Sequence, residues 1–196
     1  MQITDSVINS RIEEWSSSIF DTTTQKEIKN LQEVNPEELK ESFYKDLEFG
    51  TGGMRGIMGV GTNRINKYTL GKSTQGLSNY LIKQSGIEQP KAVIAYDCRN
   101  NSDTLAQVVA DVFTANGVKV YLFSSLRPTP ELSFAVKELG CHCGIVLTAS
   151  HNPPEYNGYK VYWKDGGQLV PPQDKEIITE INNLKYADIK FEANPA

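Results

Sequence analysis

The sequence predicts an α/β fold, a three-layer sandwich with a mixed, mostly parallel sheet and helices on both faces. Short apolar segments at 92–96, 118–123 and 144–148 have the length and composition of buried strands. Segments with helical periodicity separate them. Alternating strands and helices are typical of a largely parallel sheet that helices cover on both sides.

Residues 1–45 are predicted to form an amino-terminal helical extension packed on the core. Apolar side chains recur there at helical spacing: Val7 or Ile8, Ile12, Trp15 and Ile19. Asn35 followed by Pro36 is typical of a helix N-cap with proline in the first turn. Residues 46–185 are then expected to form the main domain, and the polar segment 186–196 to begin a linker to a missing second domain.

The main domain is expected to begin with a glycine-rich loop over 49–61. Helices and strands follow in this predicted order: a helix ending near Gly86, strand 92–96, a helix from a cap at Ser102 or Asp103 to Asn116, strand 118–123, a helix from a cap at Thr129 to Gly140, strand 144–148, strand 158–163 and helix 171–184. In such sheets ligands bind outside the carboxyl ends of the strands. The segments 96–99, 124–129 and 148–152 are therefore expected to converge.

The composition argues against several classes of protein. The 196 residues are 39% hydrophobic and carry a net charge of −4, which does not suit a nucleic-acid-binding surface. No apolar run approaches the roughly 20 residues that span a bilayer, and the first residues do not have the pattern of a signal peptide. We therefore expect a cytoplasmic protein with no nucleic-acid or membrane partner.

The sequence contains three cysteines, and two of them flank a histidine in Cys141-His142-Cys143. These residue types bind metals, but a structural zinc site needs four ligands and the sequence offers no second cluster. We expect reduced, partly buried thiols here rather than a metal site.

The segment 148–160, TASHNPPEYNGYK, contains the strongest candidate for covalent chemistry. It places Ser150 in a polar turn at the end of an apolar strand, which suits a reactive hydroxyl. His151 and Lys160 are the candidate acid/base groups. The alternatives are a turn serine bonded to the local backbone, a histidine that orders the loop, and a solvated lysine.

Two other segments suit phosphate recognition. In 49–56, FGTGGMRG, glycine amides can approach an anion closely and Arg55 can bind its oxygens. In 97–102, DCRNNS, Arg99 can orient the Ser150 loop, bind phosphate, or pair with Asp97, while Ser102 caps a helix. The segment 127–130, RPTP, is expected to be structural.

Together these segments resemble, in sequence order, the motifs of the phosphohexomutase (phosphoglucomutase/phosphomannomutase) family in its first, catalytic-serine domain. Ser102 lies one residue later than in the commonest family spelling. The extension, with Gly59 and Asn63 downstream, resembles the branch with phosphoglucomutase-2 and phosphopentomutase-like enzymes.

The resemblance implies that Ser150 carries a phosphoryl group and exchanges it with a sugar phosphate. It favours Lys160 over His151 as the acid/base group without deciding between them. The implied phosphate- or substrate-binding residues are Thr51, Gly52, Arg55, Arg99 and Asn152. The implied reaction interconverts sugar 1-phosphate and sugar 6-phosphate, with glucose preferred, through a sugar 1,6-bisphosphate that also acts as activator. Mg²⁺ would bind through the phosphate on Ser150.

Family motifs outside the first domain do not occur in this sequence, among them the aspartate metal loop, the sugar-selecting loop and the carboxy-terminal phosphate loop. The expected partners are therefore sugar phosphates and the remaining domains of the same polypeptide, and the chain alone is expected to have little or no mutase activity. One alternative is a non-catalytic sugar-phosphate-binding module of the same fold. A serine hydrolase is disfavoured, because no G-x-S-x-G elbow occurs and only His142 or His151 could serve as its base.

Overall fold

The computed structural model describes residues 5–84, 86 and 88–193, which form an α/β fold around one mixed sheet. The strands of this described part are β1 (Gly53–Ile57), β2 (Lys91–Tyr96), β3 (Lys119–Leu122), β4 (Cys143–Leu147) and β5 (Tyr156–Trp163). They lie in the order β1-β5-β4-β2-β3. Strand β2 is parallel to both of its neighbours, whereas β5 is antiparallel to both of its own. The predicted α/β class and mixed sheet are confirmed.

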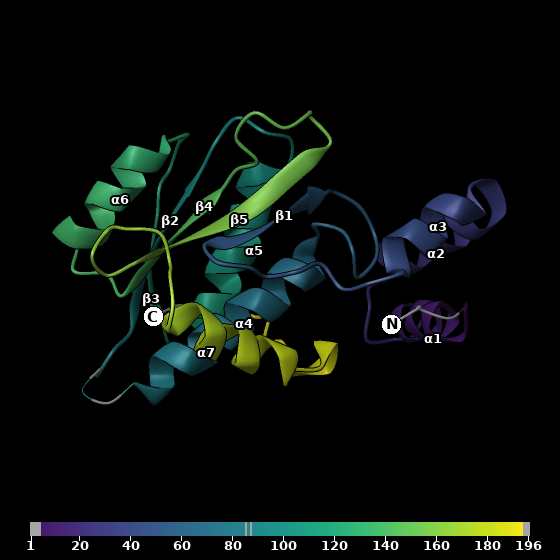
Figure 1. The fold of residues 1–196 in the computed structure, drawn as a ribbon, viewed down its shortest axis with the longest axis horizontal. Helices are drawn as coiled ribbons and strands as arrows, with labels where there is room; N and C mark the ends of the chain where they lie inside the picture. Colours follow the sequence, from purple (N-terminus) through teal and green to yellow (C-terminus); the bar gives the residue numbers. More distant parts are fainter. Residues whose placement is uncertain (1–4, 85, 87, 194–196) are drawn as a thin grey trace.

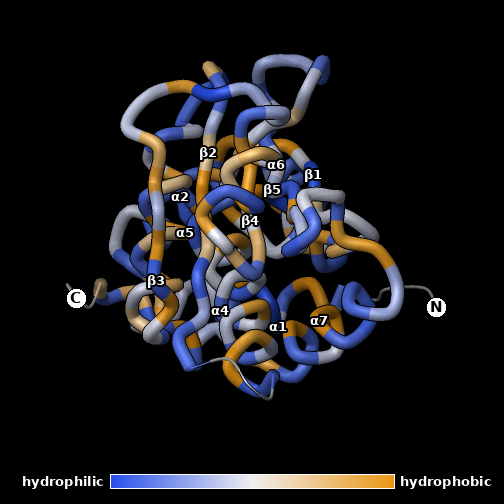
Figure 2. The backbone as a smooth tube through the Cα atoms, turned by 90° about the vertical axis from the view of Figure 1, so that its left-hand side faces the viewer, coloured by the Kyte–Doolittle hydropathy of each residue, from blue (hydrophilic) through white to orange (hydrophobic). Residues whose placement is uncertain are grey.

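Helices cover both faces of the sheet, as predicted (Figure 1). On one face lie α4 (Lys67–Lys83), α5 (Ser102–Ala115) and α7 (Gln173–Asn182), and on the other lies α6 (Thr129–Glu138). Alternate residues of a strand point to opposite faces. Accordingly Ile94 and Ile145 join the core beneath α4 and α5, whereas Val93 and Val146 pack with Leu132 of α6. Figure 2 shows the hydrophobic residues, in orange, along these central strands.

The glycine-rich segment, which we predicted as a loop over 49–61, contains the edge strand β1. Its residues do not alternate between apolar and polar, so periodicity gave no strand signal. The strand forms because β5 pairs with it, with Arg55 opposite Gly158. Gly53 makes the close pairing possible, because a Cβ at its φ of +124° would overlap the carbonyl oxygen of Tyr159.

Two predicted helix caps are wrong by one residue. Asn101 and Pro128 occupy the cap positions of α5 and α6 without a side-chain cap bond, and Ser102 and Thr129 are the first helical residues. Ser102 is fully buried, and its hydroxyl bonds the Asp97 carboxylate instead of a helix amide. Asn35, by contrast, caps its helix as predicted.

The extension consists of α1 (Asp5–Trp15), α2 (Thr22–Val34) and α3 (Pro36–Phe43), which lie together at one end of the molecule (Figure 1). Its centre is Trp15, which is fully buried and stacks on Phe20 with ring centroids 4.5 Å apart. Trp15 also contacts Tyr68 of α4 at 5.4 Å, which joins the extension to the main domain. Ile19, which we predicted to continue the apolar stripe of the first helix, is instead 49% exposed. The reason is that α1 ends at Trp15, and Phe20 is buried in place of Ile19.

Residues after 185, expected to begin a linker, pack against the same cluster. The short 3₁₀ helix η1 (Tyr186–Asp188) buries Tyr186, and Ile189 is buried after it. Residues 194–196 of the predicted linker lie outside the described residues. None of the helices in the described part of the chain has both the length and the apolar character needed to cross a membrane.

Candidate active site

Ser150 lies in the turn that follows β4, exposed and with a φ of 56°. This left-handed conformation is uncommon for residues other than glycine and needs support from its surroundings. The backbone N–H of Ser150 donates to Oγ1 of Thr148 at 2.9 Å. Its own Oγ lies 3.4 Å from Nδ1 of His151, a long and weak contact. The turn is thus held through its backbone, and the serine hydroxyl is left accessible.

Arg99 holds the Ser150 loop through its guanidinium group. Nη2 donates to the carbonyl oxygens of Ser150 at 2.7 Å and Asn152 at 2.6 Å. Nη1 donates to those of Pro153 and Tyr156, each at 3.0 Å. Because both terminal nitrogens are engaged, the geometry favours loop orientation among the roles considered for Arg99. The pairing with Asp97 is also present, but Nε lies 3.9 Å from the carboxylate.

The carboxyl ends of β2 and β4 converge at this loop. Tyr96 pairs with Leu147, so the next residues, Asp97 and Thr148, lie side by side. The Thr148 hydroxyl donates to Asp97 at 2.5 Å while accepting the Ser150 amide. Thr148 was not among the predicted site residues, although its place after a strand adjacent to Asp97 was a usable signal.

Asn157, inside the segment 148–160, is a second residue that was not among the predicted site residues. It is fully buried at the start of β5, where Nδ2 donates to the carbonyl oxygen of Asn100 at 3.1 Å and to the Ser102 hydroxyl at 3.0 Å. Its Oδ1 accepts the N–H of Gly158 at 2.8 Å. Asn157 therefore links the Arg99 segment to the strand that returns from the Ser150 loop.

The third segment expected at this edge, residues 124–129, lies beside the site. Among the described residues, no hydrogen bond or ion pair joins it to the serine turn. The backbone N–H of Arg127 donates to the carbonyl oxygen of Tyr96 at 3.1 Å, which places 124–129 next to β2. Its guanidinium pairs with Glu131 at 2.9 Å. Arg127 thus has a structural role.

The glycine-rich loop is fixed to α7 and β5. The Thr51 hydroxyl donates to Asp174 at 2.8 Å, and this carboxylate is only 3% exposed. The carbonyl oxygen of Gly52, at a φ of +81°, accepts the N–H of Val161 at 2.9 Å. Nothing in the sequence near Asp174 identified it as the partner of Thr51, since the two are far apart along the chain.

Arg55 and Lys160 line an open cleft of about 660 Å³ beside the Ser150 loop. Lys160 of β5 pairs with Gly53 of β1, so Lys160 and Arg55 project from the same face of the sheet. Arg55 Nη1 donates to Oδ1 of Asn152 at 2.7 Å and thereby contacts the serine loop. Among the described residues, no carboxylate is in ion-pair contact with either cation. Arg55 and Lys160 can therefore both offer an unpaired positive charge to an anion in this cleft.

The two histidines lie at opposite ends of β4. His151 follows the serine, whereas His142 precedes the strand and its Nδ1 accepts the N–H of Lys91 at 3.0 Å. Burial, and then the charge of Lys91, lower the pKa of His142. A hydrolase would therefore have only His151 near Ser150, and its 3.4 Å contact comes from the adjacent residue.

The described residues contain no group of three His, Cys, Asp or Glu side chains that could hold a metal ion. Burial raises the pKa of the Cys141 thiol to about 11. Asp97, the carboxylate bonded to the serine turn, already accepts the Thr148 and Ser102 hydroxyls. Mg²⁺ needs near-octahedral oxygen coordination, and the described residues do not supply such a set of ligands by themselves.

Comparison with known proteins identifies the family. A family model described as phosphoglucomutase/phosphomannomutase, alpha/beta/alpha domain I, matches residues 46–188. A phosphoglucomutase of Staphylococcus epidermidis is 42% identical over 168 residues, covering 86% of this chain and 30% of the relative. A human phosphopentomutase is 40% identical over 181 residues, covering 88% and 30% respectively.

A crystal structure of a Thermus thermophilus protein assigned as a phosphomannomutase superposes with a TM-score of 0.67 at 29% identity, covering 76% of this chain and 32% of that one. The chain thus spans about 30% of the length of the curated relatives it matches. With its α/β sheet, the serine turn after β4 and the match over 46–188, the chain belongs to the phosphoglucomutase/phosphomannomutase family and contains its domain I.

Proposed function

We propose that this chain is the phosphoserine-bearing domain of a sugar phosphomutase. The observation that carries the proposal is Ser150 itself, an exposed hydroxyl on a left-handed turn. Arg99 holds the backbone of that turn through four carbonyl oxygens, and the unpaired cations Arg55 and Lys160 line the adjoining cleft. Such a hydroxyl is fixed in place yet accessible, as a group that gives and takes a phosphoryl group must be.

The proposed reaction has two transfers. In the first, the bond between phosphorus and Oγ of Ser150 breaks while a bond forms between phosphorus and a sugar hydroxyl oxygen. The proton of that hydroxyl passes to Lys160 or His151 and then to the freed serine oxygen. In the second, the same steps run in reverse at the other phosphate of the sugar bisphosphate, which restores phosphoserine and releases the isomeric sugar phosphate.

The surrounding residues have separate roles in this proposal. Phosphoryl transfer depends mostly on positioning and on cations that offset the charge of the phosphoryl oxygens. Arg55 supplies that charge from the cleft, and Asn152 joins Arg55 to the serine loop. Lys160 adds a second positive charge in the route in which His151 takes the proton. Thr51 and Gly52 fix the glycine-rich loop that begins β1, and Arg99 positions the serine backbone rather than the phosphate.

Glucose 1-phosphate and glucose 6-phosphate are the proposed substrates, with glucose 1,6-bisphosphate as intermediate and activator. The similarity to relatives named phosphoglucomutase and phosphopentomutase makes pentose phosphates the second class to test. The remaining sugar contacts, and the carboxylates that would complete Mg²⁺ coordination around the Ser150 phosphate, are proposed to come from other domains of the same polypeptide. A cytoplasmic location stays a prediction.

The proposal is tested by turnover of the longer polypeptide with Ser150 intact and with Ser150→Ala. We expect conversion of glucose 1-phosphate to glucose 6-phosphate to fall by at least about 10³-fold in the variant, because the covalent route is lost. Ser10, exposed on α1 of the extension, provides a control hydroxyl, and Ser10→Ala should leave turnover unchanged. Equal turnover by wild type and Ser150→Ala would refute the proposal.

A further inference from the structure

The cleft beside the Ser150 loop extends beyond the matched family domain. Three of its lining residues, Glu41, Tyr44 and Lys45, precede residue 46, where the family match begins. Four basic and two acidic side chains line the cleft, in a chain whose net charge is −4. The basic ones are Lys45, Arg55, Arg64 and Lys160, and the acidic ones are Glu41 and Glu48.

Not all of these cations are free to bind a ligand. Arg64 is only 4% exposed and pairs with Glu38 at 2.7 Å, so its charge is already compensated. Lys45 is exposed, and among the described residues no carboxylate is in ion-pair contact with it. Its Nζ lies 5.2 Å from the centroid of the Tyr44 ring, and Tyr44, followed by the charges of Glu41 and Glu48, raises the pKa of Lys45, which keeps it a cation. An ammonium group has three donors, so the contact with Tyr44 leaves others for a ligand. Lys45 therefore resembles Arg55 and Lys160 in having no carboxylate in ion-pair contact among the described residues, whereas Arg64 has one.

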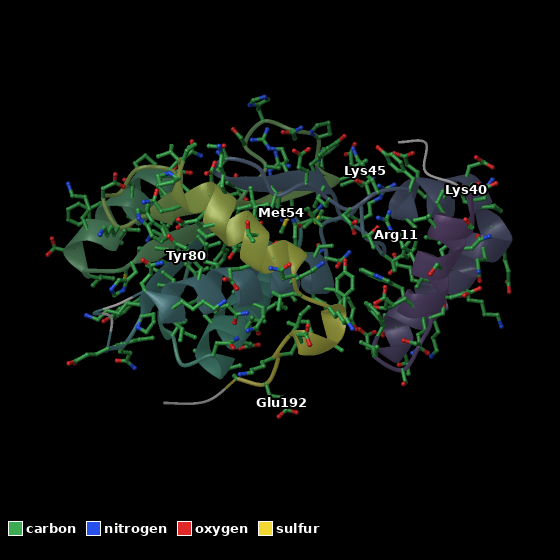
Figure 3. All side chains as sticks on the ribbon, turned by 60° about the horizontal axis from the view of Figure 1, so that its bottom comes forward. Arg11, Lys40, Lys45, Met54, Tyr80 and Glu192 are labelled. Atoms are coloured by element: carbon green, nitrogen blue, oxygen red, sulfur yellow. The ribbon has the colours of Figure 1, made fainter. Side chains whose placement is uncertain are left out.

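The backbone around Lys45 is held in place relative to the cleft. The Thr62 hydroxyl donates to the carbonyl oxygen of Lys45 at 2.6 Å, and the N–H of Leu47 donates to the carbonyl oxygen of Thr62 at 2.7 Å. The N–H of Asn63 donates to the carbonyl oxygen of Ser42 at 2.9 Å. Figure 3 shows Lys45 where the chain passes from the extension toward β1, which contains Met54. A side chain with this anchoring can serve as a fixed component of a binding surface.

We propose that Lys45, contributed by the amino-terminal extension, binds a phosphate group of the sugar phosphate in the cleft lined by Arg55 and Lys160. The identity of the ligand rests on the proposed function, whereas the cation cluster itself does not. The extension then has two roles: it packs on the main domain through Trp15, and it supplies a substrate contact outside residues 46–188.

The test measures binding of glucose 1-phosphate and of inorganic phosphate to the 196-residue chain by NMR titration. Lys45→Ala should weaken both affinities about fivefold, since one exposed cation is lost. Lys45→Arg should stay within about twofold, because it keeps the charge. The matched control is Lys40→Ala, whose lysine lies on the extension away from Lys45 in Figure 3 and should leave binding unchanged.

Three results would overturn the inference. The first is equal binding of both phosphates by wild type and Lys45→Ala, and the second is no phosphate binding by the wild-type chain. The third is a response of neutral glucose equal to that of glucose 1-phosphate, which would contradict a phosphate contact. Ser150→Ala separates this inference from the proposed function, because it should abolish turnover of the longer polypeptide while leaving phosphate binding to the cleft intact.

Discussion

The two loops beside the cleft are held in different ways. In the glycine-rich loop the backbone itself makes the decisive contact, because Gly53 lies so close to Tyr159 that no side chain fits. In the Ser150 loop, side chains from neighbouring segments hold the backbone, with Arg99 and Thr148 making most of the bonds. The first loop is therefore part of the sheet, whereas the second is a turn that the sheet's edge holds in place.

This difference predicts that changes in the glycine-rich loop affect the stability of the fold, whereas changes around the Ser150 loop affect the position of the serine. Changes in the glycine-rich loop should disturb β1 and the pairing with β5, and so the fold. Changes in the residues that hold the Ser150 loop should free the turn while the sheet stays paired, since Arg99 and Asp97 follow the end of β2. Four predictions test this contrast, beginning with the largest expected effect.

Gly53→Ala should destabilise the protein by at least about 3 kcal/mol, because the new Cβ meets the Tyr159 carbonyl oxygen at a φ that alanine rarely adopts. The matched control is Gly140→Ala, at a φ of +59° with nothing within 4 Å, which should cost only about 1 kcal/mol. Urea unfolding of both variants measures the difference. Equal losses would show that the close approach of the two strands contributes nothing.

Arg99→Ala should cost about 2 kcal/mol in unfolding free energy, because several charge-assisted bonds to carbonyl oxygens are lost together. Hydrogen exchange should accelerate in residues 150–156 but not in β4. Arg99→Lys should rescue little, since one ammonium cannot reproduce the forked donors. Unchanged exchange in the loop would contradict the positioning role.

Thr148→Val should cost about 1–2 kcal/mol, because it leaves the Ser150 amide and the Asp97 carboxylate without a shared partner. Thr51→Val is the matched change in the other loop and should cost about 1 kcal/mol, through the loss of the bond to buried Asp174. Only Thr148→Val should raise exchange at Ser150. If Thr51→Val loosens the serine turn equally, the two loops are not independent.

The smallest effect concerns the contact between α4 and α7, the helix whose Asp174 fixes the glycine-rich loop. The hydroxyl of Tyr80 in α4 donates a hydrogen bond to Glu176 of α7. Burial, and then the hydrogen bond to Glu176, raise the pKa of Tyr80 from 10.0 to about 12. The stabilisation from protonated Tyr80 is therefore complete below pH 10.0 and is lost as the pH rises through about 12.

Between about pH 10 and 11, wild type should lose about 1 kcal/mol more unfolding free energy than Tyr80→Phe, which has no phenol to titrate. Equilibrium unfolding at several pH values measures this difference. Parallel pH profiles for the two proteins would contradict the role of the Tyr80–Glu176 bond, whose oxygen atoms lie 2.6 Å apart.

Much of the fold follows from patterns that are local in sequence. Buried strands such as β2 and β4 are short apolar runs, and α4 keeps Leu70, Leu77 and Leu81 fully buried on one stripe, as its periodicity predicts. The convergence of Asp97 with the Ser150 turn also follows, because parallel strands bring their carboxyl ends to one edge.

The rest depends on contacts between residues that are distant in sequence. Strand β1 exists only because β5 pairs with it, and no periodicity in its own residues indicates a strand. Asn157 and Asp174 act on segments far from them along the chain, and neither neighbourhood signals a partner. The caps at Asn101 and Pro128 differ from the predictions, and at α5 the reason is that the Ser102 hydroxyl bonds Asp97 across the site.

The central claim is that the oxygen of Ser150 carries the phosphoryl group. Phosphopeptide mapping of the protein isolated from its source cells tests this most directly. The account predicts one phosphoryl group on the peptide that contains Ser150, removed by incubation with a sugar phosphate and restored by glucose 1,6-bisphosphate. A Ser150 that stays unmodified in the isolated protein and after exposure to the bisphosphate would contradict it.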